Sequence, residues 1–132
     1  MIGLDSNVVL RYLLNDDVKQ GEKARALLAS GGRFWLPVTV VLEVAWVLRS
    51  YGASAGAVAT GLRTLLGLSD ITVQERDAVV RALAWQQHGM DMADALHLAL
   101  SHQATNFKSF DKDFAKVAKR VATKPEVSAP LA

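Results

Sequence analysis

Four acidic residues stand out by their positions along the chain, each next to an apolar run or at the end of an expected strand. Asp5 follows the short apolar segment IGL, and Asp111 follows the segment NFKSF. Glu43 is the single charged residue in the run VTVVLEVAWVL, and Asp94 precedes the run ALHLAL. A carboxylate in apolar surroundings is costly unless it is paired, protonated or bound to a metal. Carboxylate oxygens select a hard cation such as Mg²⁺ or Mn²⁺ rather than zinc.

Helix capping is the competing local interpretation of these acids. Asp5 stands directly before Ser6 and Asn7, and all three residue types accept hydrogen bonds from the first turn of a helix. Asp91, three positions before Asp94, is interpreted as a cap. Capping also accounts locally for Asp111.

Glu43 has a different alternative. No Lys or Arg lies three or four positions from it. A salt bridge to a distant base, or exposure of one side of its helix, would therefore be needed to explain it without a metal.

The elements that must position these acids alternate along the chain. We expect helices at residues 8–14, 18–30, 38–48, 54–66, 75–87, 91–104 and 111–120. Strands are expected at residues 2–4, 34–36, 71–73 and 106–110, with residues 121–123 as a candidate last strand. Such alternation predicts an α/β fold: three α/β/α layers around a short central parallel sheet of four to five strands. We expect residues 1–132 to form a single domain.

This topology would bring the acids to one place. The carboxyl ends of parallel strands share an edge of the sheet, and ligands bind there. Asp5 and Asp111 are expected at strand-to-helix turns on that edge, Glu43 one turn into its helix, and Asp94 at the start of another. Four acids without matching bases would repel each other unless cations lay between them. The sequence therefore predicts a metal site.

Composition limits the class of protein. With 51% hydrophobic and 21% charged residues in 132, the chain is suited to a globular domain. The absence of cysteine excludes a disulfide framework, a thiol nucleophile and a cysteine zinc site. The beginning lacks the pattern of a signal peptide, and no uncharged stretch approaches the ~18 residues that span a bilayer. We expect a soluble, cytoplasmic protein without a membrane partner.

The four acids lie in segments that occur in a fixed order: LDSNVVLRYLL, VVLEVAWVL, DMADALHLALS and SFDKDFAK. Together these segments resemble the PIN-domain family over nearly the whole chain. The closest resemblance is to the VapC-type toxins of bacterial and archaeal toxin–antitoxin systems.

The resemblance implies roles for individual residues. The acidic cluster would consist of four side chains: Asp5, Glu43, Asp94 and Asp111. Ser6 would direct its hydroxyl toward the metal or the scissile phosphate, and Asn7 would brace the first turn. Ser6 and Ser109 stand where Thr is commoner in the family, which keeps the hydroxyl. Asp113 is an alternative to Asp111 as the fourth acid.

The resemblance also implies an activity and partners. The expected activity is an Mg²⁺-dependent endoribonuclease, with Mn²⁺ able to substitute. Asp5 and Asp94 would anchor the principal metal, and the other two acids would complete the ligand set or position water. Cleavage would leave a 5′-phosphate and a 3′-hydroxyl. The expected partners are an RNA substrate, a cognate antitoxin and a second copy of the chain in a homodimer.

Two apolar helix faces are the predicted antitoxin surface. They carry more apolar residues than one stripe facing a core requires. The residues proposed for this surface are Val44, Val47, Leu48, Tyr51, Val58, Leu62 and Leu65.

Other functions stay open beside the nuclease. An aspartyl-phosphate hydrolase needs a second acid two positions after its nucleophile, where this chain has Asn7. A catalytically silent α/β binding module would use the acids only as caps. No HExxH spacing surrounds His88, His97 or His102. The basic C-terminal run is either a solvated helix face or an RNA-backbone contact: Lys108, Lys112, Lys116, Lys119 and Arg120.

Overall fold

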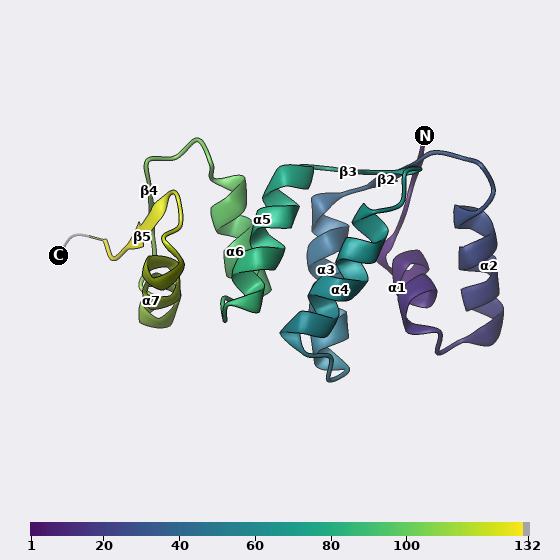
Figure 1. Cartoon of the computed structure of the whole chain (residues 1–132), viewed down its shortest axis with the longest axis horizontal. Helices are drawn as coiled ribbons and strands as arrows, with labels where there is room; N and C mark the ends of the chain where they lie inside the picture. Colours follow the sequence, from purple (N-terminus) through teal and green to yellow (C-terminus); the bar gives the residue numbers. More distant parts are fainter. Residues whose placement is uncertain (131–132) are drawn as a thin grey trace. The chain divides into compact units, whose positions relative to one another are not determined.

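The computed structural model describes residues 1–130. Helices and strands alternate along the chain, which confirms the predicted α/β class (Figure 1). Contacts between residues group the chain into two compact units, Met1–Arg76 and the part from Asp77 on. The prediction of a single domain stays a prediction. No helix within residues 1–130 is long and apolar enough to cross a membrane.

The first unit is built on three parallel strands. Its elements are β1 (Ile2–Gly3), α1 (Ser6–Leu14), α2 (Val18–Leu28), β2 (Phe34–Leu36), α3 (Val38–Ser50), α4 (Ala55–Leu66) and β3 (Ile71–Val73). The strand order is β1-β2-β3, with Ile2 opposite Phe34 and Phe34 opposite Ile71. A pair of helices connects each strand to the next, as parallel pairing requires. Phe34 and Leu36 are at most 2% exposed and anchor the core.

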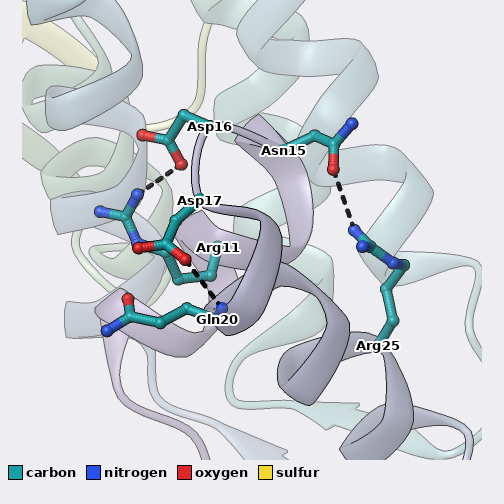
Figure 2. Close-up of polar contacts among 6 residues, drawn as sticks. All are labelled: Arg11, Asn15, Asp16, Asp17, Gln20 and Arg25. Carbon is teal, nitrogen blue, oxygen red and sulfur yellow. Dashed lines mark hydrogen bonds and ion pairs between the residues drawn. The ribbon is translucent and has the colours of Figure 1, made fainter.

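Polar contacts close the turn between α1 and α2 (Figure 2). Arg11 forms an ion pair with Asp16 on the surface, and this contact holds the pKa of the Asp16 carboxyl below its usual value. Arg25 donates a hydrogen bond to Asn15 Oδ1 at 3.2 Å. Asn15 ends α1 in the left-handed conformation, with φ of 55°, which Asn tolerates better than most residues. These contacts tie α2 against α1.

The apolar run of α3 is a helix rather than a strand. It begins after Pro37, whose fixed φ is suited to a helix start, and continues to Ser50. The backbone N–H of Val38 donates to Gln74 Oε1 at 2.9 Å, so the residue after β3 supports the start of α3. The ends of β2 and β3 are therefore fixed to each other where α3 begins.

The prediction of an exposed apolar surface on α3 and α4 is wrong. Five of its seven residues are no more than 6% exposed: Val44, Leu48, Val58, Leu62 and Leu65. The two helices contact each other, and α3 also contacts α1. A helix packed on several sides needs a wide apolar face for the core alone. Tyr51 is exposed and Val47 is half-buried.

Two substitutions on α3 separate core from surface. Leu48 is 6% exposed and Trp46 is 69% exposed. We expect Leu48→Glu to lower the free energy of unfolding by about 4 kcal/mol, because it removes a core side chain and buries a charge. Trp46→Glu is expected to change it by less than about 1 kcal/mol. Urea denaturation followed by circular dichroism measures both, and similar losses from the two would contradict this packing.

The second unit contains α5 (Arg76–Gln87) from its second residue on, α6 (Met92–Leu100), β4 (Asn106–Lys108), α7 (Lys112–Val121) and β5 (Glu126–Ser128). Strands β4 and β5 are parallel, with Asn106 opposite Glu126. The rings of Phe107 on β4 and Phe114 on α7 meet edge to face, with centroids 5.7 Å apart. All strand pairs are parallel, as predicted. Within residues 1–130 the five strands form a set of three and a set of two, rather than one sheet of four to five.

The predicted strand at residues 121–123 is wrong. Val121 is the last residue of α7, Ala122 ends the helix with φ of 56°, and Thr123 is buried beyond it. The β-branched residues indicated a strand, but Val121 also continues the helical spacing of Phe114 and Ala118. Helical packing prevailed, and the strand follows at Glu126–Ser128.

Candidate active site

Asp5 lies between a parallel strand and a helix, as predicted. Its carboxylate caps α1 by accepting the Ser6 backbone N–H at 2.8 Å. The backbone N–H of Leu4 donates to the carbonyl of Trp35 at 3.0 Å, which fixes the chain just before Asp5. The Asp5 side chain is exposed, and the cap occupies Oδ1. A carboxylate has further lone pairs, so Asp5 can cap the helix and still bind a cation.

Glu43 lies in the second turn of α3 and is exposed, although Val44 and Ala45 beside it are buried. Exposure of one helix side, the alternative left open by the sequence, is what the structure shows. Burial therefore gives no argument for a metal at Glu43. The argument for a metal at Glu43 comes from its position. Helices α1 and α3 start where the neighbouring strands β1 and β2 end, and the two helices contact each other. Asp5 and Glu43 thus belong to helices that leave the same edge of one sheet.

The supporting residues of the first turn lie beside Asp5. Ser6 is half-buried, and its hydroxyl is 3.5 Å from Asp5 Oδ1. Asn7 is exposed on α1. Their predicted roles toward a metal, a phosphate or the helix turn stay predictions.

Two more caps begin the helices of the second unit. Asp91 Oδ2 accepts backbone N–H groups of Ala93 at 3.0 Å and Asp94 at 3.3 Å, so Asp91 is a cap as interpreted. Asp111 Oδ1 accepts the backbone N–H of Phe114 at 3.1 Å and caps α7. The Ser109 hydroxyl accepts the backbone N–H of Asp111 at 3.0 Å. Ser109 thereby shapes the turn that presents Asp111.

Asp94 is the acid with a perturbed protonation equilibrium. Its side chain is half-buried in the first turn of α6. Partial burial raises the pKa of the Asp94 carboxyl, and the negative charges of Asp91 and Asp111 raise it further, while His97 acts in the opposite direction. The unit thus gathers negative charge around Asp94. A cation placed there would reverse this penalty.

The identity of the fourth acid stays a prediction, with Asp111 and Asp113 as its two candidates. Asp111, and not Asp113, is among the charges that raise the pKa of Asp94. Asp113 is exposed in the first turn of α7. Asp91 also contributes to the electrostatics of the site, because its charge raises the pKa of Asp94. The sequence interpretation treated Asp91 as a cap. The signal for this second effect was that Asp91 lies three residues before Asp94 at the start of one helix.

The donor set is suited to a hard cation, since it consists of carboxylate and hydroxyl oxygens. No group of three acidic or histidine side chains within residues 1–130 is arranged to hold a metal ion. The structure associates Asp5 and Glu43 with one sheet edge, and Asp94 with Asp111. Joint action of all four acids stays a prediction.

Comparison with protein families decides the class of this fold. The model of the PIN domain matches residues 2–120. The chain belongs to the PIN-domain family. The matched range includes all four acids and parts of both units, and it confirms the α/β PIN-like fold. PIN domains are generally nucleases that use a divalent metal. Comparison with curated proteins found no match.

Proposed function

We propose that this PIN domain is an Mg²⁺-dependent endoribonuclease and that Mn²⁺ can substitute. The observation that carries the proposal is the placement of the acids. Asp5 and Asp111 each follow a parallel strand and cap a helix, and the charge of Asp111 acts on Asp94. These positions lie within the range that matches the PIN domain.

The proposal gives each of the four acids a role at the metal site. Asp5 and Asp94 would hold the principal metal ion, and Glu43 and Asp111 would complete the ligand set or position water. When bound, Mg²⁺ supplies Lewis-acid chemistry, which activates water and stabilises the charge that develops on the phosphate. The Ser6 hydroxyl, which lies 3.5 Å from Asp5 Oδ1, would be directed toward the metal or the scissile phosphate. In-line attack by water leaves a 5′-phosphate and a 3′-hydroxyl, without use of the 2′-hydroxyl.

The biological role in the proposal is that of a VapC-type toxin. Its support is the order of the four segments in the sequence and the match to the PIN domain. The proposal includes a cognate antitoxin as inhibitor, a homodimer and a cytoplasmic location. The absence of cysteine agrees with a reducing compartment. The antitoxin surface is not the apolar face of α3 and α4, because that face is core.

A silent binding module is the second candidate. The observation in its favour is that hydrogen bonds to helix starts already account for Asp5, Asp91 and Asp111. Such a protein would need no cation.

Metal dependence separates the two candidates. The nuclease proposal expects the chain to cleave single-stranded RNA in Mg²⁺ or Mn²⁺ and to lose this activity in EDTA, with 5′-phosphate ends on the products. It also expects the ion to stabilise the fold by about 2.7 kcal/mol at a hundredfold excess over its Kd. Gel analysis of the product ends and thermal unfolding with and without Mn²⁺ measure the two effects. If the chain showed no cleavage and no stabilisation by the ion, this result would favour the binding module.

A further inference from the structure

A hollow in the second unit has a lining whose charged side chains are mainly positive, and these are separate from the four acids of the proposed site. It has a volume of about 700 Å³ and lies between α7 and the segment that leads into β5. Its charged lining consists of four lysines and one acid: Lys112, Lys116, Lys119, Lys124 and Glu126. All five side chains are exposed, and small or apolar residues line the rest. We call this feature the lysine groove.

The lysines of α7 follow the helix period and not the needs of the core. Lys112, Lys116 and Lys119 are four and three positions apart, so they share one face of α7. Phe114 is buried on another face of α7, where its ring meets the ring of Phe107 on β4. Like charges on one helix face repel each other. A bound polyanion would remove this repulsion.

The dimensions of the lysine groove suit a nucleic-acid strand. Lys112 and Lys119 are seven residues apart, which is about 10 Å along a helix. A stacked strand carries one phosphate per about 3.4 Å, so α7 can face about three phosphates. Lysine binds a phosphate as a point charge on a flexible stem.

The lysine groove also begins at a predicted catalytic acid. Asp111 caps α7, and Lys112 is the first residue of the helix and the first lysine of the groove. A strand that lies along α7 would therefore lead to Asp111. This continuity favours an RNA backbone over an acidic peptide as the occupant.

We propose that the lysine groove binds the sugar–phosphate backbone of the RNA that this domain cleaves. The proposal rests on the nuclease function and adds a binding surface to it. Contacts to phosphate fix the position of the strand and carry no sequence information. The groove would hold the substrate next to Asp111 in any sequence.

Paired charge removal tests the lysine groove in the full chain. Lys116→Gln with Lys119→Gln removes two groove charges, and Lys19→Gln with Arg63→Gln removes two exposed helix charges elsewhere. Binding of a labelled single-stranded RNA is measured in EDTA by fluorescence anisotropy at several salt concentrations. We expect the groove pair to raise Kd about tenfold and to reduce the slope of log K against log salt by about 1.4, since each phosphate contact contributes about 0.7. The control pair should change Kd less than about threefold.

The outcomes separate this proposal from the nuclease proposal. Equal effects of the two pairs, in a chain that cleaves RNA, would overturn the groove and leave the nuclease standing. RNA binding that depends on the groove pair, in a chain that never cleaves, would support the groove as an RNA site and overturn the nuclease. Polyglutamate of equal charge is the competitor for the alternative occupant. If it displaces RNA as well as unlabelled RNA does, the groove binds acidic peptide and the proposal is wrong.

Discussion

Asp5→Asn is expected to reduce RNA cleavage by at least about a hundredfold without unfolding the protein. The Asp5 carboxylate has two tasks that the substitution separates. It caps α1 by accepting the Ser6 backbone N–H at 2.8 Å, and Asn caps a helix about as well as Asp. In the proposed site it also supplies negative charge to the metal ion, which a neutral amide does not. Gel-based cleavage rates in Mg²⁺ and calorimetric titration with Mn²⁺ measure that loss.

Asp17→Asn is the matched control for this experiment. Asp17 caps α2, and its Oδ1 accepts the backbone N–H of Gln20 at 2.9 Å. It is the same residue type in the same role, but on a helix without a predicted catalytic acid. We expect its cleavage rate and unfolding midpoint to stay near those of the unchanged chain. If a folded Asp5→Asn variant cleaves RNA at the full rate, the assignment of Asp5 as a metal ligand is wrong.

Much of the local structure could be predicted because caps and apolar runs coincide. The strands Phe34–Leu36 and Ile71–Val73 lie where their sequences predicted them. The start of α6 follows the Asp91 cap as interpreted. At Val121 two local preferences competed, β-branching and helical spacing, and contacts of α7 with β5 decided between them.

The outward face of a helix is harder to predict than the helix itself. The run from Val38 to Leu48 is apolar almost throughout, so its sequence does not tell which positions meet the core. In the structure Val44 is fully buried and Trp46 is 69% exposed, because several elements surround α3 and leave one side open. Glu43 lies on such an open side. Tertiary packing, and not periodicity, assigned these faces.

For the candidate site, the sequence identified positions but not distances. Asp5 and Asp111 could be placed at helix starts because each follows a strand and has cap chemistry. The influence of Asp111 on Asp94 could not be predicted, since it depends on how α6 and α7 lie within the second unit. The choice between Asp111 and Asp113 as the fourth acid depends on the same arrangement and stays a prediction.

Asp94→Asn is expected to abolish cleavage and, without metal, to stabilise the fold at neutral pH. The pKa of Asp94 lies above its ordinary value of 3.8, first because of burial and then because of Asp91 and Asp111. The folded protein therefore binds the proton of Asp94 more tightly than the unfolded chain does. Stability from this group is fully present below the unfolded pKa and is lost as the pH rises through the folded pKa. Asn does not titrate, so the variant escapes that loss.

The stability difference between Asp94→Asn and the unchanged chain should therefore grow with pH. Urea denaturation in EDTA from about pH 3 to about pH 8 measures this difference, because the range spans the ordinary and the raised pKa of a carboxyl.

Asp91→Asn is the control for this experiment. It keeps a cap for α6 and removes one charge next to Asp94, so we expect a lower pKa of Asp94 and a weaker dependence of the free energy of unfolding on pH. Its cleavage rate should fall by less than about tenfold, against a loss of at least about a hundredfold for Asp94→Asn. The reverse order of activities would make Asp91 the metal ligand and Asp94 a structural residue. If the stability difference does not change with pH, the pKa of Asp94 is not raised by burial and by the charges of Asp91 and Asp111. The electrostatic argument for a cation beside the acids of the second unit would then be wrong.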